Sequence, residues 1–406
     1  AAQWRPCRVS PRRQCSATSK AELACWLPRQ SPCPLRKGRL PTLSAVAAAV
    51  ASTALAAPSS RLHRRARCTF STTQRARLVQ RRIAMTPPPL GTLADEPSPP
   101  GVGDAEGRWW SWRGRRIRYV VQGSGPPVLL IHGFGASAAY FRRLLPAVAA
   151  DGFVVYAVDL LGLGLSEKPP EEQYGIDLWA ELIRDFCAEV LPLGEAPVLV
   201  GNSLGSLVAL TAAAEEWGRN GGVRGLVLLN CAGGMNVKHM VTDDLTPTPL
   251  KAAASVLTGL LDALLGWRAF ALWFFERTRT PENVRETLRS IYTNKEAVDD
   301  ELVESILAPA DDPNALDVFV KILTGDPGIS PDRLMLRVKC PVRLVWGDND
   351  GFTPLEGAYG EYFRGLTATK PGVSLEIVEA GHCLHDDNPE AVHAAVLPWL
   401  ALLRHR

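Results

Sequence analysis

The sequence predicts an α/β fold: a mostly parallel central sheet with helices on both faces and an inserted helical cap. Short apolar segments that resemble buried strands alternate with helical segments along most of the chain. One stretch, residues 235–335, contains several helical patterns and no convincing strand. With 406 residues, of which 46% are hydrophobic, the chain is long enough to bury a large core.

The segments of this fold follow in a regular order. After a hairpin at 108–125, the expected strands are 127–135, 153–164, 197–200, 224–234, 341–348 and 374–381. The expected helices between them include 138–149, 176–190, 204–217 and 389–404. The cap at 235–335 follows the sixth strand, so the core domain consists of two parts, 107–234 and 336–406.

The first 90 residues differ in charge from the rest. They carry 15 Arg and 2 Lys against one acid, Glu22, whereas the remaining residues carry 28 of the 45 basic and 41 of the 42 acidic side chains. A basic segment nearly free of acids cannot build a core and is typical of an organelle transit peptide. We interpret residues 1–85 as a transit peptide and the Pro/Gly-rich residues 86–106 as a linker. A basic tail that binds nucleic acid is the weaker alternative.

The body of the chain contains four cysteines. They are Cys187, Cys231, Cys340 and Cys383, and they form no CxxC spacing. This pattern favours neither a disulfide framework nor a zinc site, and it fits a reducing compartment. We expect no metal and no cofactor. We also expect no run in the body to be long and apolar enough for a transmembrane helix.

Within the expected cap, residues 250–276 are apolar nearly all round. A helix that is hydrophobic on every side is normally buried. Two other interpretations stay open, in which the helix covers an apolar pocket or dips into a membrane surface.

Ser203 lies on a predicted turn between the strand at 197–200 and the following helix, flanked by Gly201 and Gly205. Glycines at these positions permit a tight turn in which neighbouring backbone segments approach closely. This arrangement matches the G-x-S-x-G turn that raises a serine hydroxyl above a sheet at a helix N-terminus. Ser203 is therefore the predicted nucleophile.

A serine nucleophile requires a base and a carboxylate that orients the base. Of the seven histidines, His382 and His385 follow the last expected strand. We favour His382 because Gly381 lets its loop approach the serine turn, and we expect His385 to support that loop. The preceding loop offers Asp348 and Asp350. We favour Asp350, which lies deeper in the loop, and we interpret Asp348 as a turn-forming residue.

The oxyanion of an acyl-transfer reaction needs two backbone N–H groups. Leu204, directly after the nucleophile, offers one of them from the helix N-terminus. Phe134, in the segment HGFG at 132–135, offers the other. The chain order Ser203, Asp350, His382 is the order found in α/β-hydrolases.

These residues resemble the α/β-hydrolase superfamily over roughly residues 108–406. A finer match is to plant and algal chlorophyll dephytylases, which are relatives of pheophytinase. The matching stretches are 155–169, 201–206, 225–236, 298–328, 346–357 and 381–390. The cap stretch at 298–328 is the most specific of them, because superfamily members rarely share cap sequence. Leu384 departs from the pattern, since relatives often have proline there.

The resemblance implies hydrolysis of the phytyl ester of chlorophyll, in the chloroplast and at or near thylakoids, without a cofactor. The cap aromatics Trp267, Phe270, Trp273 and Phe274 would then bind the hydrocarbon chain, although packing of the cap onto the core explains them equally well. The expected partner is a hydrophobic ester and not nucleic acid. Peripheral contact with the thylakoid membrane and the oligomeric state stay open.

Two other functions remain as alternatives. The first is a plastid lipase or esterase that acts on galactolipids or other acyl esters. The second is a cap-gated small-molecule receptor that retains the triad, and the plastid-type leader argues against it. A serine at position 203 also excludes the chemistry of epoxide hydrolases and haloalkane dehalogenases, which place aspartate there.

Overall fold

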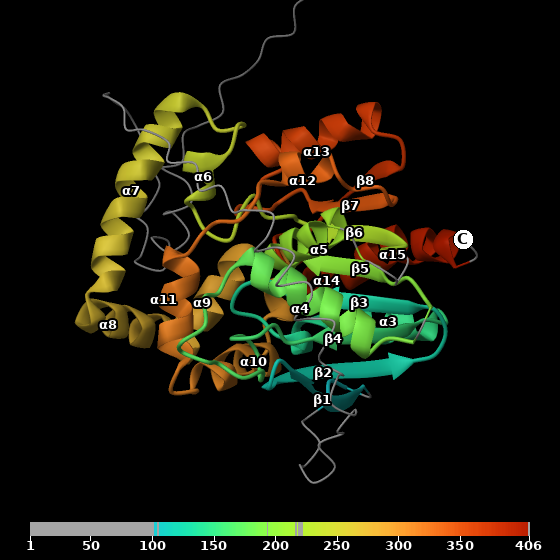
Figure 1. The fold of residues 1–406 in the computed structure, drawn as a ribbon, viewed down its shortest axis with the longest axis horizontal. Helices are drawn as coiled ribbons and strands as arrows, with labels where there is room; N and C mark the ends of the chain where they lie inside the picture. Colours follow the sequence, from blue (N-terminus) through green and yellow to red (C-terminus); the bar gives the residue numbers. More distant parts are fainter. Residues whose placement is uncertain (1–100, 104, 193, 216, 218–221, 405–406) are drawn as a thin grey trace, which may run out of the picture. The chain divides into compact units, whose positions relative to one another are not determined.

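A computed structural model of the chain describes residues 101–103, 105–192, 194–215, 217 and 222–404. The expected transit peptide and most of the expected linker lie outside these residues. In the described part, eight strands form one sheet in the order β1-β2-β4-β3-β5-β6-β7-β8 (Figure 1). The strands are β1 (Glu106–Trp112), β2 (Arg115–Gly123), β3 (Pro127–Ile131), β4 (Val154–Val158), β5 (Val198–Asn202), β6 (Gly225–Leu229), β7 (Val342–Gly347) and β8 (Val373–Val378).

The sheet is parallel except at one edge. β1 and β2 form an antiparallel hairpin, and β2 also pairs with β4 in antiparallel orientation. Arg113 and Gly114 connect the hairpin with φ of 51° and 78°, and a two-residue turn with positive φ at both positions matches the twist of the strands. The other neighbours in the sheet pair in parallel. The predicted fold class is confirmed.

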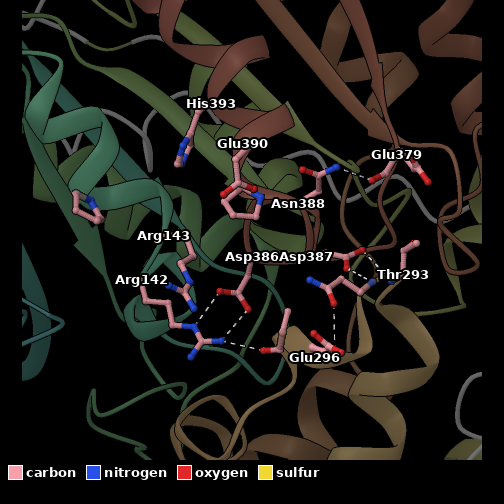
Figure 2. A pocket seen from close by; sticks show the side chains of 14 residues that line it. Arg142, Arg143, Thr293, Glu296, Glu379, Asp386, Asp387, Asn388, Glu390 and His393 are labelled. Carbon is pink, nitrogen blue, oxygen red and sulfur yellow. Dashed lines mark hydrogen bonds and ion pairs between the residues drawn. The ribbon is translucent and has the colours of Figure 1, made fainter.

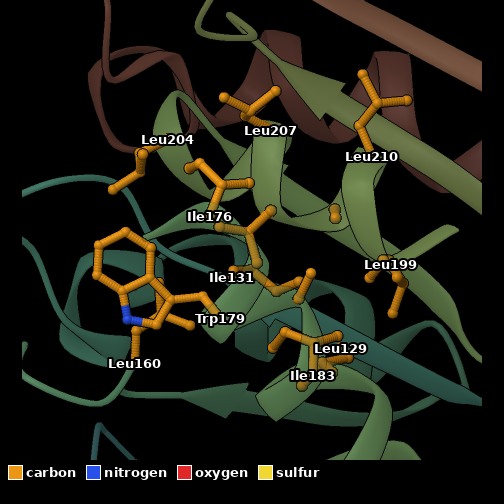
Figure 3. Close-up of a cluster of buried hydrophobic side chains, with 14 of the residues drawn as sticks. Leu129, Ile131, Leu160, Ile176, Trp179, Ile183, Leu199, Leu204, Leu207 and Leu210 are labelled. Atoms are coloured by element: carbon orange, nitrogen blue, oxygen red, sulfur yellow. The ribbon is translucent and has the colours of Figure 1, made fainter. Parts of the chain in front are cut away.

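Helices cover both faces of the sheet because the side chains of its central strands are buried on both sides. In β3, Leu129 and Ile131 join one apolar cluster, whereas Val128 and Leu130 join the other. Figure 3 shows the first cluster, where Trp179 and Leu207 lie near the strand residues. The core helices are η1 (Ala138–Phe141), α3 (Leu144–Ala150), α4 (Ile176–Glu189), α5 (Leu204–Ala214), α13 (Ala358–Thr369), α14 (Leu384–Asp387) and α15 (Pro389–Leu403). Helices α4, α5 and α13 contribute to the first cluster, and α3 and α15 contribute to the second.

Between β6 and β7 the described chain contains helices and no strand. They are α6 (His239–Thr242), α7 (Thr248–Gly266), α8 (Arg268–Thr278), α9 (Pro281–Ile291), η2 (Lys295–Ala297), α10 (Asp300–Ala310), α11 (Ala315–Thr324) and α12 (Pro331–Met335). We call residues 235–335 the cap.

The apolar stretch of the cap differs from the expectation in two ways. It forms two helices rather than one, because the chain leaves helical geometry at Trp267, with φ −84° and ψ 101°. Little of it is buried, since the buried share of the most apolar part of α7 is 17%. By length and composition α7 could cross a membrane, so the expectation that no body segment reaches that threshold was wrong. The expectation of burial failed because burial depends on neighbouring helices, which a sequence window does not include, whereas the length and apolar composition of α7 are properties of the sequence itself.

Candidate active site

The turn that carries Ser203 is tight and strained. Ser203 has φ 54° and ψ −118°, a region that residues with a side chain rarely adopt and that costs on the order of 1–3 kcal/mol. A Cβ atom at Gly201 would collide with the backbone of Gly205, and a Cβ atom at Gly205 would collide with the carbonyl of Ile131. The two glycines therefore provide space, and the turn places the Ser203 hydroxyl at the carboxyl edge of the sheet.

Ser203, His382 and Asp350 come together after three different strands, β5, β8 and β7. The Nε2 atom of His382 lies 2.9 Å from the Ser203 hydroxyl oxygen. Its Nδ1 atom lies 2.9 Å from the Oδ2 atom of Asp350. His382 and Asp350 are buried, and Ser203 is half-buried. The arrangement forms an unbroken chain of hydrogen bonds from hydroxyl to imidazole to carboxylate.

Asp350 is held in its ionised form. Its Oδ1 atom accepts N–H bonds from Phe352 and Thr353, at 2.8 and 3.0 Å, and the Thr353 hydroxyl donates to Oδ2 at 2.6 Å. Burial alone would raise the pKa of Asp350, but attraction to His382 and these hydrogen bonds outweigh burial, so the pKa is lowered. A carboxylate that stays charged keeps the imidazole oriented and stabilises it when it takes up a proton.

The other candidates for base and carboxylate occupy different positions. Asp348 is exposed, and its carboxylate accepts the Ala380 N–H at 3.1 Å, which links the loops after β7 and β8. His385 is buried beside the rings of Phe141 and Tyr140, with ring centroids 4.8 and 5.8 Å away. Burial lowers the pKa of His385 to about 4, so its imidazole is neutral at physiological pH.

Two asparagine side chains fix the backbone of His382. Asn230 donates to the carbonyls of Gly381 and His382, at 3.0 and 2.9 Å, and Asn202 donates to the His382 carbonyl at 3.3 Å. The Oδ1 atom of Asn230 accepts the Gly347 N–H at 2.9 Å, so Asn230 joins the ends of β6 and β7 to the histidine loop. Sequence reasoning missed Asn230. Its position directly after a strand, in the segment LLNCAGG, was the available signal, because asparagine tolerates the positive φ of 47° found there.

The loop after β3 lies against the serine turn. A Cβ atom at Gly133 would lie 3.4 Å from that of Ser203. His132 supports this loop, because its Nδ1 atom lies 2.8 Å from the Gly133 carbonyl oxygen and its Nε2 atom accepts the Leu160 N–H. Phe134 follows Gly133, and Leu204 is the first residue of α5, where backbone N–H groups lack partners within the helix. The two predicted oxyanion residues thus belong to the two segments that flank Ser203.

A series of aromatic rings connects this loop to the cap. Phe134 contacts Phe319 of α11 at a centroid distance of 6.0 Å, and Phe319 contacts Phe274 at 6.1 Å. Phe274 stacks on Phe270 at 6.1 Å, and Phe270 contacts Trp273 at 5.6 Å. We call these five residues the ring series. Phe270 and Phe274 are half-buried within it, and both of its ends are exposed, Trp273 to 53% and Phe134 to 42%.

Three of the four aromatic residues predicted to bind substrate, Phe270, Trp273 and Phe274, belong to the ring series. Trp267, the fourth predicted substrate-binding residue, has no ring contact with the series and is 65% exposed. Phe319 was missed. The signal for it was the apolar periodicity of the segment ALDVFVKIL, which predicts a packed helix but does not reveal which ring of that helix faces the site.

Asp386 and Asp387 connect the histidine loop to the cap. The buried Asp387 carboxylate accepts the N–H groups of Gly381, Thr293 and Asn294 at 2.5, 2.9 and 2.6 Å. In addition, the His382 N–H donates to the carbonyl of Ile291, the last residue of α9, at 2.9 Å. The end of α9 is therefore bonded directly to the backbone beside the imidazole.

Asp386 makes a second link on the same side. Its carboxylate accepts a bond from Arg142 at 2.9 Å (Figure 2). It also accepts a bond from the Tyr292 hydroxyl at 3.1 Å. Arg142 also bonds the carboxylate of Asp299, directly before α10. Sequence reasoning missed these roles of Asp386 and Asp387. The paired acids in GHCLHDDN were a signal that some donor set must surround them, but not which one.

A cavity of about 780 Å³ lies at this linkage, and Arg142, Asp386 and Asp387 form part of its lining (Figure 2). Its charged lining residues include Arg142, Arg143, Glu296, Glu379 and Glu390, and His393 also lines it. None of Ser203, His382 and Asp350 lines it. Among the described residues, no group of three or more His, Cys, Asp or Glu side chains is arranged to hold a metal ion.

Comparisons with known proteins agree with this geometry. A sequence profile described as "Alpha/beta hydrolase family" matches residues 128–395. Pheophytinase of Arabidopsis thaliana, a chloroplastic protein, is 26% identical over 328 residues, which span 70% of this chain and 64% of the relative. An uncharacterized protein of Mycobacterium tuberculosis is 30% identical over 283 residues, which span 68% of this chain and 75% of that protein. A solved serine hydrolase involved in carbazole degradation superimposes with a TM-score of 0.54 at 24% identity, covering 73% of this chain and 99% of its own.

Proposed function

The chain belongs to the α/β-hydrolase family, and from that premise we propose that it is a serine ester hydrolase that removes phytol from chlorophyll or a close derivative. The observation that carries the hydrolase part of the proposal is the unbroken hydrogen-bond chain from Ser203 through His382 to Asp350. The ring series starts at Phe134, next to the glycine that packs against the serine turn, and its apolar side chains suit an apolar ester. Chlorophyllide would be the acid product.

In the proposed mechanism, Nε2 of His382 takes the Ser203 proton while the serine oxygen attacks the ester carbonyl. Asp350 holds the imidazole through Nδ1 and stabilises the imidazolium that forms. The backbone N–H groups of Phe134 and Leu204 stabilise the oxyanion. His382 then donates its proton to the leaving phytol oxygen. A water molecule, deprotonated by His382, hydrolyses the acyl-enzyme and releases chlorophyllide.

The choice of substrate rests on three supports. The stretches that resemble chlorophyll dephytylases include cap sequence at 298–328. The relative from Arabidopsis thaliana is named pheophytinase. The ring series offers apolar surface next to the serine, and burial of a hydrocarbon chain contributes about 0.8 kcal/mol per methylene. The acidic body and basic, acid-poor leader further support a chloroplast location at or near thylakoids.

The decisive experiment incubates the purified protein with chlorophyll and separates chlorophyllide and phytol by chromatography. We expect Ser203→Ala to abolish product formation while the thermal unfolding midpoint stays close to that of the wild type. Ser290→Ala, which changes an exposed serine of α9, is the matched control and should keep full activity. Chlorophyll hydrolysis by the purified Ser203→Ala protein would refute the assignment of the nucleophile.

The same assay separates the alternatives. Galactolipid included as a second substrate distinguishes a plastid lipase, which would release fatty acid faster than phytol. Binding of a small ligand with negligible turnover of either ester would instead support a cap-gated receptor.

A further inference from the structure

Helices α7 and α8 expose an unusual amount of apolar surface. Of the eleven large hydrophobic side chains that are exposed in the described residues, five lie between positions 256 and 273. They are Val256, Leu260, Trp267, Leu272 and Trp273, with exposures of 75%, 56%, 65%, 47% and 53%. Figure 1 shows α7 and α8 at the outer side of the cap, away from the sheet. We call this pair of helices, residues 248–278, the apolar ridge.

The charges inside the ridge are neutralised by partners. Residues 252–275 contain two charged side chains, Asp262 and Arg268. Asp262 pairs with Lys238 at 2.9 Å, and Arg268 pairs with Asp317 at 2.6 Å. The ridge therefore offers a long apolar surface whose two internal charges are paired, which suits the hydrocarbon layer of a bilayer.

Cationic side chains lie at the borders of this surface. Lys251, half-buried in the first turn of α7, donates to the carbonyl of Asp243, and Arg277 is exposed near the end of α8. The acid at the end of α8, Glu276, pairs with Arg279. Apolar and tryptophan side chains bordered by cations complement a lipid surface, where hydrocarbon lies below phosphate-bearing headgroups.

Ring contacts also connect the ridge to the loop beside the triad. Trp273, on the exposed side, is the outer end of the ring series that leads through Phe270, Phe274 and Phe319 to Phe134. Phe134 follows Gly133, which packs against the serine turn. The ring contacts thus run from the exposed side of the ridge to the loop that packs against the serine turn.

We propose that the apolar ridge is a membrane-binding surface that inserts into one leaflet of a lipid bilayer and through which a lipid-dissolved ester reaches Ser203. The identity of the ester rests on the proposed function, whereas the binding to lipid does not. Insertion removes the five exposed side chains from water without burying an unpaired charge.

The test compares two triple variants. V256Q/L260Q/L272Q places amides on the ridge, at side chains outside the ring series. L336Q/I377Q/L402Q changes three side chains outside the ridge, with exposures of 82%, 49% and 70%. Both proteins and the wild type are floated with vesicles of phosphatidylcholine and phosphatidylglycerol at high salt. All three proteins carry the same basic leader, and salt screens its attraction to the lipid.

We expect the ridge variant to bind vesicles roughly tenfold more weakly than wild type and control, because three side chains no longer gain from leaving water. Hydrolysis of a short, water-soluble ester should be equal in all three proteins. Equal flotation of both variants would overturn the proposal. The proposal would also be overturned if the wild type self-associated in the absence of lipid and the ridge variant did not, because a second copy of the chain would then cover the ridge. Vesicle binding is also measured with the Ser203→Ala protein, which should bind like the wild type. Lipid binding is thereby tested separately from chlorophyll hydrolysis, so that one proposal can fail without the other.

Discussion

The two halves of the cap meet their surroundings in opposite ways. Helices α9 and α10 share an apolar cluster with Tyr140 and Cys383 of the core, and the end of α9 is bonded to the histidine loop. Helices α7 and α8 instead pack on α11 in a separate cluster, and large apolar side chains of both helices remain exposed. The comparison teaches that the cap is not one functional unit: one half positions the imidazole, and the other half presents a surface.

The difference follows from how apolar residues are distributed along each helix. In α9, PENVRETLRSI, the buried Val284 and Leu288 lie on one face, and charged residues occupy the other. One neighbouring surface is enough to bury that stripe. In α7 apolar residues surround the helix, so contact with α6, α8 and α11 cannot cover them all.

The largest effect should come from breaking the anchored half at Asp387. Asp387→Asn replaces one of the two acceptor oxygens with an N–H₂ group, which then faces at least one of the three N–H donors. We expect kcat for a short ester to fall roughly 10- to 100-fold with little change in KM, because a displaced imidazole slows proton transfer rather than binding. Steady-state kinetics on a soluble ester measures this split.

The matched control is Asp243→Asn. Asp243 is equally buried and accepts bonds from Thr246 and the Tyr359 hydroxyl, but it has no contact with the histidine loop. Both variants should lose thermal stability, and only Asp387→Asn should lose kcat. Equal losses of kcat in the two variants would mean that Asp387 acts through general stability alone.

A smaller effect should appear with pH on the anchored side, where His385 packs against η1. Burial lowers the pKa of His385 from 6.5 to about 4. At pH values between about 4 and 6.5, His385 binds a proton in the unfolded chain but not in the folded chain. The free energy of unfolding therefore decreases as the pH falls through this range. The predicted loss is about 2 kcal/mol between pH 7 and pH 5.

Urea unfolding at several pH values measures this loss, and His385→Phe should flatten it. Asp350 acts in another window, because its pKa lies below 3.8 and its contribution is lost only at lower pH. An unchanged slope in the His385→Phe protein would show that another group produces the acid sensitivity.

The smallest effect should come from Phe319 of α11, which lies between Phe134 and Phe274 in the ring series. Phe319→Leu keeps an apolar side chain in the cluster of α8 and α11 but removes the ring between Phe134 and Phe274. Ring contacts contribute about 0.5–1.5 kcal/mol, so kcat/KM for a phytyl ester, relative to that for a short ester, should fall roughly threefold to tenfold. A ratio equal to that of the wild type would show that the ring series does not contact the alcohol chain.

The sequence by itself determined the parallel sheet and the positions of Ser203, Asp350 and His382. Each of these depends on local patterns: apolar runs of strand length, a glycine-flanked turn, and loops that follow successive strands. Because parallel strands end at the same edge of a sheet, residues that follow them meet even when they are far apart in the chain. That rule made the hydrogen-bond chain predictable without coordinates.

Only the tertiary structure decided which half of the cap is anchored and which is exposed. The link between Arg142 and Asp386 joins residues 244 positions apart, and no local pattern specifies such a pair. The exposure of α7 likewise depends on how much of its surface α6, α8 and α11 cover, whereas its composition alone favoured burial. Burial and long-range polar contacts are properties of neighbours in space, and the three-dimensional packing of the whole chain selects those neighbours.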